Sequence, residues 1–113
     1  MSRAPNLSRA LTLETPQTTP DGAGGFVTEW HALGTLWAEI RASAGRERQT
    51  ELGPQGEQRL RMLVRAAPQG APQRPRPDQR FREGARIFRI LSVTEADAQG
   101  RYLICLTQEE SPA

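Results

Sequence analysis

Short stretches in which hydrophobic and polar residues alternate run along most of the chain. Leu11 and Leu13 alternate with other residues in residues 10–14, and residues 26–33 alternate in the same way. Because successive side chains of a strand point to opposite faces, this period of two predicts half-buried β-strands. Residues 35–41 continue the pattern, with Leu36, Ala38 and Ile40 on one face and Trp37, Glu39 and Arg41 on the other.

The second half of the chain predicts further strands of the same kind. Residues 57–67 predict a strand whose apolar face holds Leu60, Met62 and Val64 and whose basic face holds Arg59, Arg61 and Arg65. Residues 78–93 predict a short strand, a turn at Glu83 and Gly84, and a longer strand. The longer strand has apolar residues on both parities, so either both of its faces are buried or a bulge shifts its register. Residues 101–107 are again apolar on both faces.

Turn-forming residues separate these strands. Residues 15–25 contain two prolines, an Asp-Gly pair and a Gly-Gly pair, and they predict a loop. The proline-rich residues 68–77 predict an extended, exposed connection, and residues 96–100 predict a hairpin turn. Residues 42–58 are a polar, charged excursion of a length that is usually functional or disordered.

Six or seven short strands without a convincing long helix predict an all-β fold. A barrel and a sandwich both fit this pattern, and we favour a small antiparallel β-barrel with long loops. At 113 residues the chain is most simply one domain, residues 1–113, with a flexible leader at 1–8 and a flexible tail at 109–113. With 36% hydrophobic residues, we expect a thin core.

Charge is distributed unevenly along the chain. All fifteen basic residues are arginine, which suits recognition of carboxylate or phosphate and can equally reflect genomic base composition. Residues 41–89 contain twelve arginines and five acids, a net charge of +7, whereas the rest of the chain carries −5. Such a basic middle can face nucleic acid or an acidic protein surface, or it can simply be solvated.

The sequence offers little to support catalysis. The glycines of residues 22–25 precede a strand pattern and lack the Lys-Ser/Thr of a phosphate loop, so they predict a turn. His31 has no Ser or Cys motif near it, and Cys105 lies in an apolar strand, where a buried thiol acts as a small hydrophobe. With one His and one Cys, a structural zinc site is not expected. We therefore predict a non-enzyme without metal or cofactor, and no apolar run is long enough to predict a membrane span.

Three local patterns, in their order along the chain, resemble the head-tail joining proteins of long-tailed phages and gene transfer agents, also called head-closure, stopper or head-tail adaptor proteins. They are Asp-Gly-x-Gly-Gly-x-x-x-x-Trp at residues 21–30, Trp-Ala-x-Ile at 37–40, and Gly-Arg-Glu at 45–47. The resemblance covers about residues 9–108. The loop at residues 68–77 departs from it, being longer and richer in Pro and Arg.

The resemblance implies a small β-barrel that assembles as a homo-oligomeric ring between the portal-bound adaptor and the tail, either its terminator or its tube protein. Such a ring continues the channel for packaged double-stranded DNA, touches the DNA non-specifically and helps to retain it. The implied location is the head-tail interface of a phage or gene transfer agent particle assembled in the bacterial cytoplasm. Candidate ring, partner or channel residues are Trp37, Arg46, Glu47, Arg48, Arg74 and Arg76, with Arg59, Arg61 and Arg65 as a candidate basic strand face.

Two other classes of function stay open at this stage. The basic middle also fits a stand-alone, nucleic-acid-binding small β-barrel, although no aromatic cluster accompanies the basic strand to stack bases. A small enzyme or enzyme accessory subunit would need a pocket with converging polar groups, which the sequence does not indicate. Trp37 itself is interpreted either as part of a second core or a side chain folded over the barrel end, or as an aromatic anchor at a protein contact.

Overall fold

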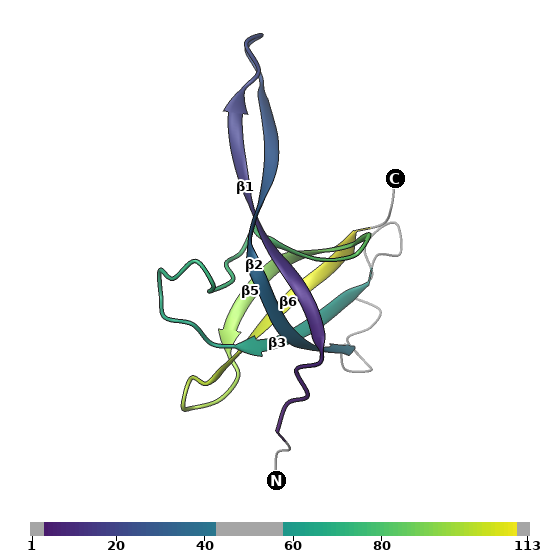
Figure 1. Ribbon diagram of the computed structural model, residues 1–113, viewed down its shortest axis with the longest axis vertical. Helices are drawn as coiled ribbons and strands as arrows, with labels where there is room; N and C mark the ends of the chain where they lie inside the picture. Colours follow the sequence, from purple (N-terminus) through teal and green to yellow (C-terminus); the bar gives the residue numbers. More distant parts are fainter. Residues whose placement is uncertain (1–3, 43–57, 111–113) are drawn as a thin grey trace.

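The computed structural model describes residues 4–42 and 58–110. In these residues six antiparallel strands close into one barrel in the order β1-β2-β3-β6-β5-β4 (Figure 1). The predicted all-β antiparallel barrel is therefore confirmed. The strands are β1 (Arg9–Pro20), β2 (Phe26–Ala42), β3 (Arg59–Arg65), β4 (Arg80–Glu83), β5 (Arg86–Glu95) and β6 (Tyr102–Glu110).

Alternation along the strands fills the barrel, as the hydrophobic pattern predicted. Leu11 and Leu13 of β1 point inward with Ala38 of β2, while Trp37, the neighbour of Ala38 in β2, faces out. The apolar face of β3 is buried and its arginines lie on the outer face. The fully buried core consists of Leu11, Leu13, Ala38, Met62, Val64, Phe81, Phe88, Ile90, Leu103 and Cys105.

A bulge explains why β5 has apolar residues on both parities. Its pairing with β6 shifts between Ile90 and Ser92, so Leu91 is the extra residue. Phe88 and Ile90 point inward before the shift and Val93 packs against the core after it. A single inserted residue exchanges the two faces of a strand, so the second of the two alternatives holds.

The prediction of a loop over residues 15–25 was wrong. Residues 15–20 belong to β1 and pair with residues 26–31 of β2, and the turn itself is only residues 21–25. The resulting hairpin, residues 15–31, projects beyond the barrel (Figure 1). We call it the arm. Its base lies at the register shift between Leu13 and Glu14, where Gly34 of β2 has a φ of 141°.

Both prolines of the arm fit a strand because each lies on its free edge. Asp21 N–H donates to the carbonyl of Gly25 at 3.0 Å, so this pair is hydrogen-bonded. Hydrogen-bonded and non-hydrogen-bonded pairs alternate along an antiparallel ladder. The pairs Pro20–Phe26 and Pro16–Trp30 are therefore both non-hydrogen-bonded. Their ring nitrogens face away from β2, where a missing donor costs no ladder bond.

The segment that connects β3 to β4, residues 66–79, is largely exposed, as predicted for residues 68–77, but it is turned rather than extended. Two turns fold this segment back, with Ala71 N–H donating to Pro68 O and Arg74 N–H to Ala71 O, both at 3.0 Å. Pro75 is fully buried. Consecutive tight turns therefore fold the segment back on itself instead of extending it.

Residues at both ends of the described chain contact the barrel. In the leader, Asn6 N–H donates to the Glu39 carboxylate at 2.7 Å. At the other end, Glu109 and Glu110 belong to β6 and pair with Phe88 and Ile87 of β5. β6 thus continues to Glu110.

Candidate interaction surfaces

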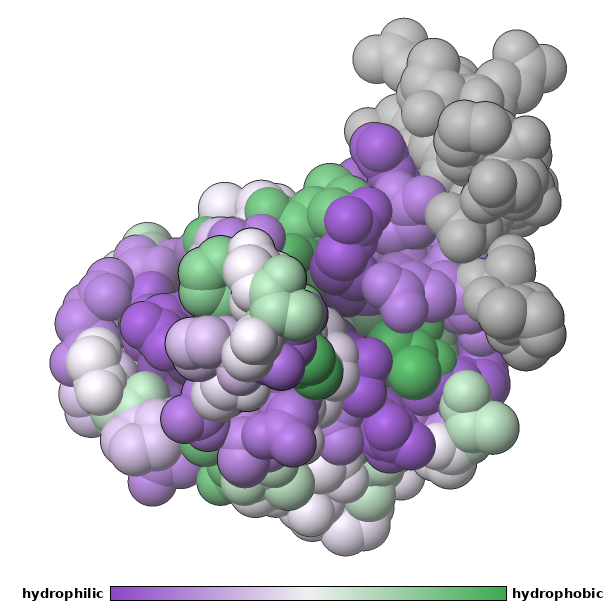
Figure 2. Space-filling model, turned by 90° about the horizontal axis from the view of Figure 1, so that it is seen from above, coloured by the Kyte–Doolittle hydropathy of each residue, from purple (hydrophilic) through white to green (hydrophobic). Residues whose placement is uncertain are grey.

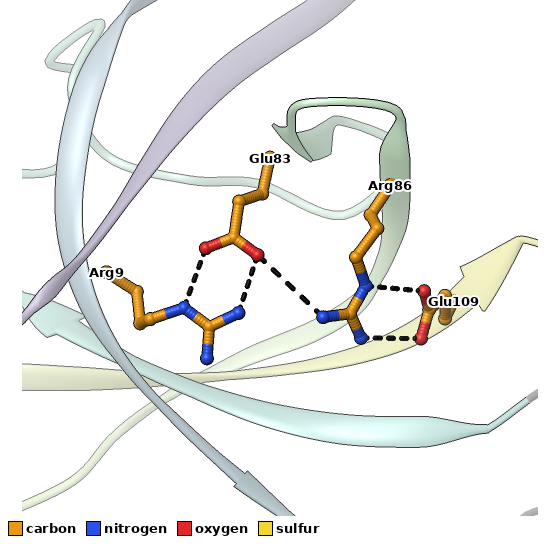
Figure 3. A network of polar contacts seen from close by, with 4 residues as sticks. All are labelled: Arg9, Glu83, Arg86 and Glu109. Carbon is orange, nitrogen blue, oxygen red and sulfur yellow. Dashed lines mark hydrogen bonds and ion pairs between the residues drawn. The ribbon is translucent and has the colours of Figure 1, made fainter.

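Charged side chains close one end of the barrel. Arg9, Glu83, Arg86 and Glu109 have the same parity as the core residues of their strands, and they form a chain of ion pairs (Figure 3). Arg9 binds both carboxylate oxygens of Glu83, at 2.7 and 2.6 Å, and Arg86 binds both of Glu109, at 2.8 and 3.0 Å. A longer contact of 3.8 Å joins Arg86 to Glu83. The network links β1, β4, β5 and β6 where the apolar core ends.

These contacts shift the titration of the carboxyl groups. The hydrogen bond from Arg9 lowers the pKa of Glu83, and the positive charge of Arg9 lowers it further by a smaller amount. The hydrogen bond from Arg86 does the same for the pKa of Glu109. In both cases the guanidinium outweighs partial burial, which acts in the opposite direction. Both groups therefore stay ionised to lower pH than free glutamate.

A second, more buried cluster fixes the base of the arm. Glu14 of β1 receives hydrogen bonds from Arg80 at 2.6 Å and Arg82 at 3.2 Å, and the side chains of Glu14 and Arg80 are only 10% and 12% exposed. The Arg80 guanidinium also lies 4.0 Å from the ring centroid of Trp30, which belongs to the arm. One arginine thus joins the arm to the barrel by an ion pair and a cation-π contact.

Strand register places Arg80 in a row of polar residues across the outer face. Arg80 pairs with Arg89, Arg89 with Gln108, and Gln108 with Arg59, so β4, β5, β6 and β3 each contribute one residue. We call this the arginine row. Arg59 was predicted as part of a basic strand face, but Arg80 and Arg89 were missed because only strand pairing brings them beside it.

The outer face of β2, β3 and β6 holds an aromatic and basic cluster. Trp37 is 56% exposed. Continuing the β2–β3 register by one residue sets Trp37 opposite Arg65. Arg65 in turn pairs with Tyr102, and its guanidinium carbon lies 5.9 Å from the centroid of the Tyr102 ring. Trp37 is therefore exposed on the outer face and is not packed over the barrel end.

A groove of about 370 Å³ lies on the same side of the barrel. Its apolar lining includes Leu63, Tyr102 and Ile104, with Arg41 and Arg101 among its charged residues. We call Trp37, Arg65 and Tyr102 together with this groove the β2–β3–β6 face.

The other predicted site residues lie in different places. Arg61 faces outward on β3 beside Arg41. Arg74 is half-buried and donates to Ala67 O at 2.9 Å, so it stabilises its own loop, whereas Arg76 is exposed. Arg46, Glu47 and Arg48 lie outside the described residues. The structure thus sets Trp37 opposite Arg65 and holds Arg74 in the β3–β4 connection.

The tip of the arm exposes large apolar side chains. Phe26 is 70% and Val27 48% exposed. The turn beneath them is organised by Asp21, whose carboxylate accepts hydrogen bonds from the N–H groups of Ala23 at 2.8 Å and Gly25 at 3.0 Å. These backbone donors lower the pKa of Asp21. In Figure 2, which looks down on the molecule from the side of the arm, hydrophobic and neutral side chains gather on the near end.

The described residues contain no arrangement typical of catalysis. Burial raises the pKa of the Cys105 thiol to about 12, so the sulfur is a poor nucleophile at neutral pH. No group of His, Cys, Asp or Glu within residues 4–42 and 58–110 is placed to hold a metal ion. In the same part of the chain no helix is long and apolar enough to cross a membrane. The barrel presents the arginine row, the β2–β3–β6 face and an exposed arm, an arrangement typical of a binding or assembly module.

Comparison with known proteins defines the family. The phage head completion protein family matches residues 2–110 of the chain. A chain in the structure of the virion of a native gene transfer agent particle is 46% identical; the match covers 97% of this chain and 100% of that chain, with a TM-score of 0.75. No curated protein matched the sequence.

The chain belongs to the phage head completion protein family. This confirms the family expected from the sequence patterns, and it gives the protein a structural role in completing the head of a phage-type particle. A protein of Shigella flexneri 2a solved in solution is 21% identical over 95% of this chain and 96% of its own, with a TM-score of 0.68. At that identity the likeness extends to the fold alone.

Proposed function

We propose that the protein is a non-enzymatic head-closure, or stopper, protein that forms a homo-oligomeric ring between the portal-bound adaptor and the tail of a phage or gene transfer agent particle. The ring continues the DNA channel and helps to retain packaged DNA. The observation that carries this proposal is the 46% identity, over 97% of the chain, to a component of a native gene transfer agent particle.

The architecture supports assembly rather than action by a single copy. An exposed arm and the β2–β3–β6 face give the chain two different surfaces, and a ring of identical subunits needs two different surfaces on each copy. Trp and Arg, which predominate where protein contacts carry most of their binding energy, meet at Trp37 and Arg65. The small core fits a protein that gains further burial from its neighbours.

Contact with DNA is assigned to exposed arginines. Arg89 in the arginine row and Arg76 in the β3–β4 connection are both exposed and lie outside the β2–β3–β6 face. Such contacts would go to phosphates and carry no sequence preference. Because each phosphate contact releases a counterion, DNA retention by the ring should weaken as salt rises.

The first test is to mix the purified protein with the portal-adaptor complex of its own particle. We expect light scattering and negative-stain imaging to show a ring added to the end of that complex. A persistent monomer that ignores the complex but binds short DNA tightly would overturn the proposal in favour of the stand-alone nucleic-acid-binding barrel.

Charge reversal tests the DNA contact separately. In particles carrying Arg76→Glu and Arg89→Glu together, we expect DNA to leak at a lower salt concentration than from unaltered particles, with head-tail joining intact. A matched control is Gln99→Glu, an exposed residue in the β5–β6 turn. Equal DNA retention in all three particles would remove these two arginines from the channel.

A further inference from the structure

The arm differs in charge from the rest of the described chain. Residues 15–31 contain Asp21 and Glu29 and no Arg or Lys, a net charge of −2. The remaining described residues contain twelve arginines and eight acids, a net charge of +4. The arm is therefore an acidic projection from a basic barrel.

The arm also has an apolar face. Pro20 pairs with Phe26, and Pro16 with Trp30, so these four side chains share one side of the two-stranded ribbon. Arg80 covers the ring of Trp30 at the base, whereas Phe26 at the tip is 70% exposed. A two-stranded hairpin extended from its domain gains little from exposing a phenylalanine, so this exposure indicates a contact surface.

The β2–β3–β6 face has the complementary properties. Leu63, Tyr102 and Ile104 give its groove an apolar wall, and Trp37 adds an exposed aromatic ring beside it. Its charged outward residues are Arg41, Arg61, Arg65 and Arg101 against Glu39 and Asp97, a net charge of +2. An acidic arm with an apolar side fits such a surface in both charge and hydrophobicity.

The arm does not contact the β2–β3–β6 face of its own chain. In Figure 1 the arm rises from one end of the molecule, while the N-terminal segment, whose Ala4 and Pro5 line the groove, lies at the other. The longest extent of the molecule is 57 Å. An arm that occupies this groove must therefore come from another copy of the chain.

We propose that the arm of one copy packs on the β2–β3–β6 face of a second copy, with Phe26 in the groove. The contact uses two different patches of the same chain, so each copy can accept one arm while donating its own, and repetition with closure gives a ring. This inference rests on the proposed function, which supplies the ring, and it names the surfaces that hold the ring together.

Photo-crosslinking from the arm tip tests the assignment. A benzophenone amino acid replaces Phe26, an exposed position where the fold should tolerate it, and the assembled particles are irradiated. We expect crosslinks between copies of this chain, in peptides that contain Leu63 or Tyr102. The same amino acid at Ala85, exposed in the β4–β5 turn, is the matched control and should give no such crosslink.

The other outcomes overturn the inference in distinguishable ways. Crosslinks from position 26 to the arm of a second copy would indicate arm-to-arm pairing, and crosslinks to a different particle protein would make the arm a device for binding that protein. Either result refutes the arm-to-face contact while leaving the chain at the head-tail joint. Absence of the protein from that joint in images of the same particles would refute the proposed function instead.

Variants give a second measurement that does not depend on crosslinking. Phe26→Ser should weaken self-association of the purified chain by about tenfold or more, as expected for a buried aromatic anchor, and Trp37→Ala should do the same from the other side. Their double variant should be little worse than either alone, because both remove one contact. Unchanged self-association in Phe26→Ser, with an unchanged circular dichroism spectrum, would overturn the proposal.

Discussion

In the barrel, β1 and β2 each lie between two neighbouring strands, whereas in the arm they pair only with each other. β1 pairs with β2 and β4 over residues 12–14, and β2 pairs with β1 and β3 from Ala38. β1 has no pairing with β4 beyond Glu14 and β2 none with β3 before Ala38, so in the arm each strand exposes an edge. The same two strands thus serve as part of a closed core in one region and as an isolated ribbon in the other.

The phenylalanines show the difference most clearly. Phe81 and Phe88 pair across β4 and β5 and are 0% exposed, while Phe26 at the arm tip is 70% exposed. Burial stabilises a fold in proportion to the apolar area removed from water. The barrel phenylalanines therefore contribute to folding, and the one in the arm is available for a contact with another molecule.

The largest expected effect comes from emptying the barrel at one of these positions. Phe88→Ala should lower the free energy of unfolding by about 3–5 kcal/mol, since it removes a large buried side chain and leaves a cavity. Phe26→Ala should change it by less than about 0.5 kcal/mol. Urea unfolding monitored by tryptophan fluorescence measures both. Similar losses in the two variants would mean that the arm tip packs on the barrel after all.

A smaller loss is expected where the arm joins the barrel. Glu14→Gln removes the carboxylate that neutralises Arg80, a side chain only 12% exposed, and should cost roughly 3 kcal/mol because it leaves a buried charge without its partner. The control in the arm is Glu29→Gln, an exposed acid that should have almost no effect. A negligible loss for Glu14→Gln in urea unfolding would show that Trp30 alone holds Arg80.

Acid should weaken the barrel through the ion pairs at its closed end. The folded pKa values of Glu83 and Glu109 lie below the unfolded value of about 4.3, so their contribution is complete above that pH and is lost as pH falls through the folded values. We expect unfolding free energy to drop below about pH 4.5, by about 1 kcal/mol or less for each partly exposed pair.

The double variant Glu83→Gln, Glu109→Gln isolates this contribution. It should be less stable at neutral pH and lose less stability on acidification than the unaltered chain, as measured by urea unfolding at a series of pH values. The arm acid Glu29 again provides the control. If the double variant keeps the full acid dependence, the titration belongs to other carboxyl groups.

The smallest global effect is expected at the tip of the arm. Gly24 has a φ of 87°, so Gly24→Ala should strain the turn by about 1–2 kcal/mol without contacting any other atom. Because the arm can open without the barrel, amide hydrogen exchange should accelerate at Thr19 and Val27 and stay unchanged at Met62 and Leu103. Faster exchange in the barrel as well would show that the two regions unfold together.

Local patterns predicted most of the barrel. Strand faces and the turns at residues 84 and 96–100 follow from alternation and turn chemistry, which act between near neighbours in sequence. The extent of the arm did not follow from local patterns, because its prolines and glycines predicted a loop from Thr15 onward. Only the pairing of β1 with β2 shows that Pro16 and Pro20 lie on a free edge, where they are tolerated.

The candidate surfaces were predicted in part. The strand faces of Trp37 and of the β3 arginines were predicted, because alternation assigns a face within one strand. Their neighbours were not, since Arg80, Arg89 and Tyr102 lie far away in sequence and join them only through register. Arg74 was named as an interface candidate on its charge, and the structure adds its hydrogen bond to the carbonyl of Ala67 in its own loop.

The sequence by itself determined the strands, their buried faces, the glycine turn and the family, because each depends on residues within a few positions or on short patterns in order. Tertiary structure decided which strands neighbour one another, that charged residues close one end of the barrel, and that an acidic arm leaves it. Those features depend on pairings between residues such as Arg9 and Glu83, 74 positions apart, which fold into contact only when the whole sheet closes.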